Sequence, residues 1–249
     1  MNIIEENNIL GESCLWNHYN NKFYWVDIID KKIKSYNGDV VEIFETEKMP
    51  CCITLLDNNT FTLALEDEIG IYDIRNNSFN SQLKLNDKRV RFNDGKLDKN
   101  DILYIGTMDR EAKEHIGEIY KYENNYLEPI IKNVGISNGI SFDDDNKMYW
   151  SDSLDRKLYY ENELIKEYED MTPDGAYINK KGDYHSCLWG GSKIDIYRNR
   201  KIFDNIVLPV EYPTCCCYGG NDMNKLFITS ASVLNKEKEN GKCIILDIE

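Results

Sequence analysis

Residues Arg91 to Lys96 bring an arginine, an asparagine, an aspartate, a glycine and a lysine together in the run RFNDGK. Burying so many polar groups is costly unless they bind one another or a ligand. Asn-Asp-Gly is also common in turns, so the segment alone fits either a binding site or an ordinary turn. The choice depends on whether other segments present polar residues at corresponding places.

Short β-like segments recur along the chain, each after a turn rich in Asn, Asp, Gly or Lys. Their second residues lie at positions 23, 61, 103, 148, 184 and 226, so the steps are 38, 42, 45, 36 and 42 residues. The segments are Lys22–Asp27, Thr60–Leu65, Ile102–Thr107, Lys147–Asp152, Asp183–Leu188 and Lys225–Ser230. A period of about 40 to 45 residues built from short strands is typical of propeller blades.

The sequence therefore predicts an all-β fold, a six-bladed β-propeller that fills residues 1–249 as a single domain. A β-sandwich or barrel with evenly spaced strands is the alternative, but spacing alone does not explain why side-chain types recur as well. We expect Asn2–Ile4 to pair as an outer strand of the last blade, near Lys225–Ser230 and Lys242–Asp247. Such pairing joins the chain ends and removes a sheet edge.

One residue in each unit lies ten or eleven positions before the second residue of the repeated segment. The six residues are Glu12, Cys51, Asn93, Asn138, Asp174 and Cys216. The first strand of each propeller blade lines the central channel, so we expect these residues to converge on one mouth of that channel. Four of the six carry oxygen ligands, which favours a binding site over unrelated turns.

Glu12, Asn138 and Asp174 form an all-oxygen set with two negative charges. Hard divalent cations prefer such ligands, with Ca²⁺ the first choice, Mg²⁺, Mn²⁺ and Fe²⁺ also accepted, and Zn²⁺ less natural without His or Cys. Three protein ligands leave coordination positions open for water and substrate, as in catalytic metal sites. The sequence thus predicts a site for one divalent cation.

Several other patterns have structural explanations. The run Gly135–Gly139 matches the G-x-S-x-G nucleophile elbow around Ser137, but that elbow needs a helix, and a strand and hairpin turn follow here. Asp143–Asp145 lacks the ligand spacing of a calcium loop and is interpreted as a turn. Cys215–Cys217 lack the spacing of a thiolate metal site. The three histidines fall outside the shared phase and are interpreted as ordinary: His18, His115 and His185.

Charge and composition narrow the classes of partner that we expect this protein to bind. The net charge of −14 disfavours nucleic acid and anionic membranes, which attract proteins rich in Lys and Arg. No run has the length of a signal peptide core or a membrane span. The eight cysteines include adjacent ones, between which disulfide geometry is poor. We therefore expect reduced thiols in a soluble, cytoplasmic protein.

The sequence resembles the SMP-30/gluconolactonase/luciferin-regenerating-enzyme family, which includes regucalcin, through motifs that run in order over nearly the whole chain. They are Gly11-Glu12-Ser13, Arg91–Lys96 with Gly106-Thr107-Met108, Ser137-Asn138-Gly139, Pro173-Asp174-Gly175, and Pro213-Thr214 with Gly219-Gly220. The Arg91–Lys96 block is the most specific of them. One departure is Cys14, which stands where the family usually has proline and leaves the neighbouring ligand in place.

The resemblance implies a six-bladed propeller with one divalent cation at the channel mouth. Carried over by position, the family's metal ligands fall on Glu12, Asn138 and Asp174. Its contacts with substrate hydroxyls fall on Arg91, Asn93 and Glu111.

The expected function is a metal-dependent lactonase that hydrolyses a sugar lactone to the aldonic acid, with Asp174 as the base. The alternatives are a phosphotriesterase-like or other ester hydrolase at the same metal site, a calcium-binding propeller without catalysis, and a scaffold propeller that binds a protein at its rim. Retention of Arg91, Asn93 and Glu111 beside the ligands favours catalysis.

Overall fold

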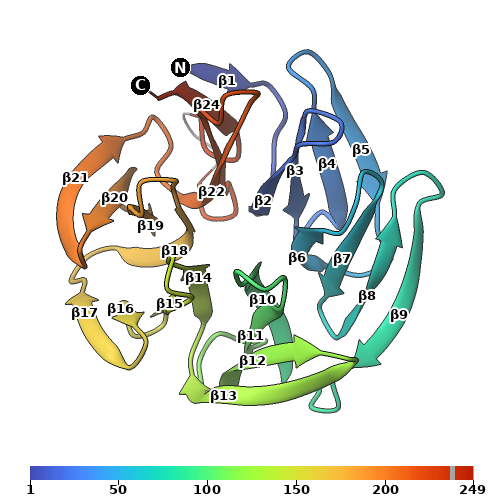
Figure 1. Cartoon of the computed structure of the whole chain (residues 1–249), viewed down its shortest axis with the longest axis horizontal. Coiled ribbons are helices and arrows are strands. Elements are labelled where there is room, and N and C mark those ends of the chain that lie inside the picture. Colours follow the sequence, from blue (N-terminus) through green and yellow to red (C-terminus); the bar gives the residue numbers. More distant parts are fainter. Residues whose placement is uncertain (236–238, 249) are drawn as a thin grey trace.

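The computed structural model describes residues 1–235 and 239–248, whose strands form six four-stranded antiparallel sheets arranged in a ring (Figure 1). Within those residues the chain contains no helix. Each of the first five sheets is a meander of consecutive strands, and the sixth has the order β1-β24-β23-β22. The chain is therefore the six-bladed β-propeller that the repeat predicts.

Blades one to three hold strands β2 to β13. Their bounds are β2 (Gly11–Asn17), β3 (Lys22–Asp27), β4 (Lys32–Tyr36), β5 (Val41–Glu45), β6 (Pro50–Leu55), β7 (Thr60–Leu65), β8 (Glu68–Asp73), β9 (Ser78–Lys84), β10 (Val90–Leu97), β11 (Leu103–Asp109), β12 (Gly117–Glu123) and β13 (Tyr126–Val134).

Blades four to six hold the remaining strands, together with the N-terminal one. Their bounds are β14 (Ser137–Phe142), β15 (Met148–Asp152), β16 (Lys157–Tyr160), β17 (Glu163–Glu167), β18 (Thr172–Ile178), β19 (Tyr184–Trp189), β20 (Lys193–Arg198), β21 (Lys201–Val207), β22 (Pro213–Gly219), β23 (Lys225–Ser230), β24 (Cys243–Asp247) and β1 (Asn2–Ile4).

The six repeated segments are the second strands of the six blades. Three of them, β3, β7 and β23, have the predicted bounds, and the other three begin one residue later than predicted. Burial falls from the inside of each blade to its outside: β15 is buried throughout, whereas β21 at the rim is almost entirely exposed. The apolar residues of the inner three strands pack between neighbouring blades, which fixes the ring around its channel.

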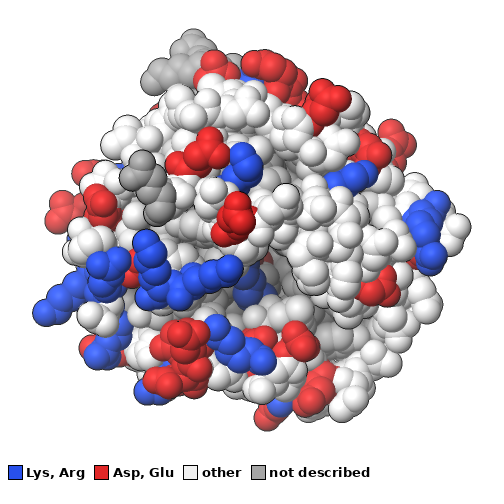
Figure 2. All heavy atoms as spheres, turned by 45° about the horizontal axis from the view of Figure 1, so that its top comes forward, with Lys and Arg blue, Asp and Glu red and all other residues white. Residues whose placement is uncertain are grey.

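Charged side chains lie on the surface of the ring. Figure 2 shows a hollow at the centre of one face, with a row of Lys and Arg side chains reaching its edge and Asp and Glu side chains around much of the remainder. No described helix has the length and apolarity needed to span a membrane.

The N-terminal strand closes the ring, as the sequence predicts. β1 pairs with β24 through Asn2–Ile245, Ile3–Ile244 and Ile4–Cys243, so the first residues of the chain complete the last blade (Figure 1). Asn8 extends this seam, because its backbone N–H donates to Gly241 O at 2.7 Å and its carbonyl accepts the Ser232 hydroxyl at 2.7 Å.

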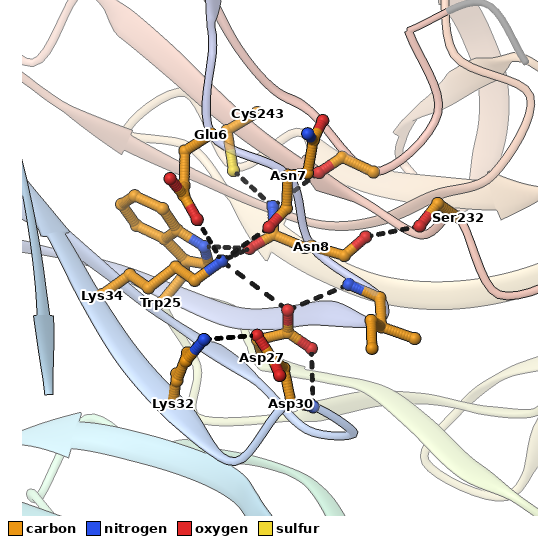
Figure 3. Close-up of polar contacts among 12 residues, drawn as sticks. Glu6, Asn7, Asn8, Trp25, Asp27, Asp30, Lys32, Lys34, Ser232 and Cys243 are labelled. Atoms are coloured by element: carbon orange, nitrogen blue, oxygen red, sulfur yellow. Dashed lines mark hydrogen bonds and ion pairs between the residues drawn. The ribbon is translucent and has the colours of Figure 1, made fainter. Parts of the chain in front are cut away.

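A buried lysine joins this seam to the first blade. Lys34 on β4 is fully buried, and its ammonium group lies 2.9 Å from Glu6, 2.7 Å from the carbonyl of Asn7 and 3.0 Å from the side-chain oxygen of Asn8 (Figure 3). It also lies 3.6 Å from the buried carboxylate of Asp27. A buried charge requires such complete pairing, so Lys34 ties the segment after β1 to blade one.

Asp27 itself binds backbone. Its carboxylate accepts hydrogen bonds from the N–H groups of Ile9, Leu10 and Asp30 at 2.9 to 3.2 Å. One acidic side chain at the end of β3 therefore organises both the entry to β2 and the turn after β3, and it also provides a counter-charge for Lys34.

Removing the buried ammonium group should destabilise the whole fold. Replacing Lys34 with Met leaves Asp27 buried without its cation, and breaking a buried pair in this way costs about 3–5 kcal/mol. Urea denaturation measures the loss. Lys32→Met is the matched control, because Lys32 pairs with Asp30 at 2.7 Å near the surface and such pairs contribute about 1 kcal/mol or less. Equal small losses in both variants would contradict the role given to Lys34.

The histidine on β19 should make folding sensitive to acid. His185 is buried; its Nδ1 lies 3.0 Å from Asp183 O, and its Nε2 lies 3.0 Å from the Tyr218 hydroxyl. Burial lowers the pKa of His185, so the unfolded chain takes up a proton at higher pH than the folded chain does.

Stability should therefore fall as the pH drops below about 6.5, with a slope of at most about 1.4 kcal/mol per pH unit from this group. Denaturation midpoints measured between neutral pH and pH 5 test this expectation. His185→Gln should be less stable at neutral pH yet show a flatter dependence. A variant with the same slope as the wild type would assign the acid sensitivity to other groups.

Candidate metal and catalytic site

Each inner strand of the ring carries a β-bulge at the same level. Pairing with the second strand shifts register between Glu12 and Leu15, Phe92 and Gly95, Asn138 and Ser141, and Pro173 and Ala176, and likewise after Pro50 and Pro213. Bulges redirect side chains out of the sheet. Because the blades repeat, the bulged residues come together around one end of the channel.

Glycines make this crowded arrangement sterically feasible. Gly139 follows Asn138 with φ of 64°, and a Cβ atom there would lie 2.5 Å from the Tyr184 hydroxyl. At Gly175, after Asp174, a Cβ atom would lie 2.8 Å from Thr214 O on the next inner strand. The Asn-Gly and Asp-Gly pairs of the sequence therefore serve a packed bulge rather than a free surface turn.

A chain of hydrogen bonds orients the two amide side chains across three blades. Asn93 donates to Asn138 Oδ1 at 3.1 Å and to Ser137 O at 2.9 Å. Asn138 in turn donates to the Ser153 hydroxyl at 2.9 Å, and Ser153 donates to Pro173 O at 2.6 Å. Both amides are buried and their nitrogen atoms are used by protein, while each oxygen atom accepts one hydrogen bond, from Arg91 or Asn93, and keeps a second lone pair for a ligand.

Arg91 lies beside this pair. Its guanidinium group donates to Asn93 Oδ1 at 2.9 Å and to Phe92 O at 2.8 Å, and it approaches Cys51 Sγ at 3.7 Å. Burial, partly offset by Arg91, raises the pKa of Cys51 to about 11, so this residue is a neutral thiol. The structure thus brings Arg91, Asn93 and Cys51 together at the mouth.

Three inner strands bring carboxyl groups into mutual electrostatic contact. Burial, followed by repulsion from Asp174, Cys215 and Asp94, holds the pKa of Glu12 well above its ordinary range. Burial and repulsion from Asp94 do the same to Asp174. Burial raises the pKa of Asp94 to about 6, against the opposing effects of Lys96 and of nearby backbone N–H groups.

These carboxyl groups fit a cation. Among the described residues, none of the three forms an ion pair with a lysine, arginine or histidine. Clustered acids that are desolvated and unpaired oppose folding unless they are protonated or neutralised. The other potential metal ligands beside these carboxylates are amide oxygens. The set therefore offers hard oxygen ligands, which suit Ca²⁺, Mg²⁺ or Mn²⁺ better than thiophilic metals.

Glu111 is set apart from the other five predicted site residues. It lies in the turn after β11, its side chain is 71% exposed, and its carboxylate pairs with Lys113 at 2.7 Å. No hydrogen bond or ion pair connects it with Glu12, Arg91, Asn93, Asn138 or Asp174, all of which are described. The role of Glu111 in substrate binding therefore stays a prediction.

The sixth in-phase position differs from the one expected. The bulge of β22 contains Thr214 and Cys215, and Cys216 lies beyond it. Cys216 packs with Ile194 and Ile228 between blades, so it does not face the mouth. The prediction for Cys216 is wrong because the turn between β22 and β23 is longer: Leu226 pairs with Tyr218, eight residues before it, whereas Met148 pairs with Phe142, six residues before it. The electrostatic neighbour of Glu12 is Cys215.

The patterns set aside in the sequence have structural roles. Ser137 is fully buried on β14 and its hydroxyl contacts Thr107 O at 3.3 Å, so it is not an exposed nucleophile. Asp143 caps its own hairpin turn by accepting from the N–H groups of Asp145 and Lys147. All eight cysteines are buried, unpaired thiols.

One further group has the composition of a metal site. His115, Asp152 and Asp155 present ligand atoms within 4.8 Å of one another. However, Asp152 already accepts backbone N–H groups from Gly135 and Ile136, at 2.8 and 3.1 Å.

An equivalent turn in the first blade explains the arrangement of Asp152 and Asp155. Asp27 binds the N–H groups of Ile9 and Leu10 in the same way, in the related sequences DIIDKK and DSLDRK. Lys32 pairs with Asp30 as Lys157 pairs with Asp155. The acidic pair is therefore a repeated turn structure that forms without a metal.

Asp94 and Ser153 are the residues of the site that sequence reasoning did not assign. Asp94 was visible as a carboxylate inside RFNDGK, but alternation along a regular strand would place only one of Asn93 and Asp94 toward the channel. The bulge makes both available. Ser153 lies in the loop after β15 and carries no sequence signal for its contact with Asn138.

Two named proteins are similar to this chain over most of its length. Regucalcin of Danio rerio is 27% identical over 258 residues, covering 93% of this chain and 86% of that protein. A 6-deoxy-6-sulfogluconolactonase of Pseudomonas putida is 26% identical over 251 residues, covering 92% and 86%.

A crystal structure of a calcium-binding protein, regucalcin, from Agrobacterium tumefaciens superposes with a TM-score of 0.89. It is 20% identical and covers 99% of this chain and 92% of that one, which shows a shared fold. The model of the SMP-30/gluconolactonase/LRE-like region matches residues 10–232. The chain therefore belongs to the SMP-30/gluconolactonase/LRE-like family.

Proposed function

We propose that this protein is a divalent-metal-dependent lactonase that hydrolyses a sugar lactone to the corresponding aldonic acid. The observation that carries the proposal is the convergence of Glu12, Asp174 and the Asn93–Asn138 pair on one end of the channel. The relatives named as 6-deoxy-6-sulfogluconolactonase and L-arabinolactonase, the latter from Azospirillum brasilense, support the substrate class.

Glu12, Asn138 and Asp174 would hold the cation, with Asn93 as an additional amide neighbour. A divalent cation bound there would polarise the lactone carbonyl and favour negative charge on its oxygen. Ca²⁺ is the ion we expect first, because the donors are all oxygen; Mg²⁺, Mn²⁺, Fe²⁺ and Zn²⁺ are the ions to compare with it.

Asp174 is the proposed base. Its carboxylate would take a proton from the water that attacks the carbonyl carbon, and the ring C–O bond would then break. The proton would pass to the departing ring oxygen, so the product is the open-chain hydroxy acid. Arg91 and Asn93 would hold the sugar hydroxyls. Arg91 offers N–H donors next to Asn93, and Asn93 belongs to the amide network at the mouth.

Metal-restored turnover is the primary test. The protein is stripped with EDTA, refilled with each of the five cations in turn, and supplied with aldonolactones while acid release is followed with a pH dye. We expect turnover only with a cation, and a loss of about a thousandfold in Asp174→Asn, which keeps the shape of the side chain but removes the base and one ligand charge.

Asp155→Asn is the matched control, because Asp155 belongs to the acidic turn with His115. It should keep both metal binding and turnover. Loss of metal-dependent activity in Asp155→Asn but not in Asp174→Asn would move the cation to that turn. Tight cation binding without turnover on any lactone or ester would favour a binding propeller, and turnover on phosphotriesters or simple esters alone would change the substrate class.

Arg91 should act on substrate binding. Arg91→Met removes the donors at the mouth and leaves the four oxygen-bearing residues in place, so we expect KM for the best lactone to rise about tenfold or more with a smaller effect on kcat. Steady-state kinetics measure both constants. The control is Arg89→Met, since Arg89 pairs with Asp87 on the surface. Unchanged kinetics in Arg91→Met would remove Arg91 from the site.

A further inference from the structure

The other end of the channel contains a separate cavity. It has a volume of about 430 Å³ and is lined by the later residues of the inner strands, including Leu15 and Trp16 of β2, Thr54 of β6, Lys96 of β10 and Tyr177 of β18. Glu12, Asn138 and Asp174 are not among its lining residues. Since all six inner strands run in the same direction, this cavity lies toward the end of the channel opposite the mouth, and it reaches inward to Ser13, Asp94 and Cys215 at the level of the bulges.

Lys96 is the unusual group in this cavity. Among the described residues its ammonium group has no hydrogen bond and no ion pair, and its one close partner is the ring of Tyr177, with the centroid 5.0 Å away. Burial lowers the pKa of Lys96, but Cys215 and Asp94 nearby raise it more strongly, so the ammonium group stays charged at neutral pH. A partly buried cation without an oxygen partner favours binding of an anion.

Thr54, from the neighbouring blade, contributes to the wall, but its hydroxyl oxygen is itself buried and does not open into the cavity. The ammonium group of Lys96 is therefore the polar group on which a ligand would bind.

The remaining wall defines the rest of the ligand. Apart from these groups it consists mainly of aliphatic and aromatic side chains and of thiols that burial keeps neutral, such as Cys14. Besides its thiols and the tyrosines Tyr177 and Tyr218, its titratable side chains are those of Asp94, Lys96, Lys180 and His18. The carboxylate of Asp94 is held by the N–H groups of Gly95 and Ile140, at 2.8 and 3.2 Å, and lies outside ion-pair distance of Lys96.

We infer that this cavity binds a monocarboxylate with an apolar body, the carboxylate on Lys96 and the apolar part against Leu15 and Trp16. One negative charge suits one buried ammonium group, whereas a dianion such as phosphate would meet Asp94 and the strongly acidic protein. The volume corresponds to a small ligand of roughly six to ten carbon atoms. The inference does not depend on the lactonase activity.

Calorimetric titration of the full-length, EDTA-treated protein tests this inference, since the opposite mouth then offers no cation to a carboxylate. The probes are octanoate, the neutral octanamide, gluconate and inorganic phosphate. We expect one octanoate per chain with a Kd below about 1 mM, and binding at least about tenfold weaker for the other three. Equal affinity for octanoate and octanamide, or no octanoate binding, would overturn the proposal.

Variants locate the bound carboxylate. Lys96→Met should weaken octanoate about tenfold or more while octanamide binding changes little, and Lys99→Met, on a surface lysine paired with Asp144, should leave both unchanged. Wild-type affinity in a folded Lys96→Met would overturn the proposal. Should Lys96→Met fail to fold, the comparison of octanoate with octanamide still decides whether charge is required.

Discussion

Closure of the ring is the constraint on which the rest of the molecule depends. Six sheets that each bury both faces against neighbours need the first and sixth to meet, and the chain achieves this by placing β1 on β24. Lys34 adds a charged connection, because Glu6, Asn7 and Asn8 all reach its ammonium group from the segment that follows β1. The first and last strands of the chain are thereby held together in one sheet, so neither is left as a free end of the ring.

The closed ring also determines the electrostatics of the channel. Residues distant in sequence, such as Glu12 and Asp174, become neighbours only when six inner strands surround one axis, and the same closure removes them from water. Burial and neighbouring carboxylates then raise the pKa of both groups, which is a cost to stability that a bound cation would offset. Such a cost is common at functional sites, and here it accompanies the proposed cation site.

The two ends of the channel differ in chemistry because bulges occur at only one level of the inner strands. Near the beginnings of these strands, the bulges present acids and amides. Near their ends, regular alternation returns, and Leu15, Trp16 and Tyr177 line an apolar cavity around Lys96. One fold thus offers a polar, anionic mouth and an apolar mouth with a buried cation, joined by the inner strands themselves.

The sequence by itself determined the fold class and much of the site. Repeated strand spacing predicted six blades with nearly correct second strands, and the in-phase residues Asn93, Asn138 and Asp174 do lie in or beside the bulges. Spacing is informative here because each blade repeats one hydrogen-bonding pattern. The same logic failed at Cys216, because the turn between β22 and β23 is two residues longer than the turn between β14 and β15.

Only the tertiary structure decided which groups meet across blades. The contact of Asn138 with Ser153, the exposure of Glu111, the involvement of Asp94 and the isolation of Lys96 all depend on how neighbouring sheets pack. Local sequence fixes the residues that a strand presents on each face, but burial and pairing are properties of the assembled ring. Charge interactions fall off with distance and depend on exclusion of water, so they are set only after the ring has closed.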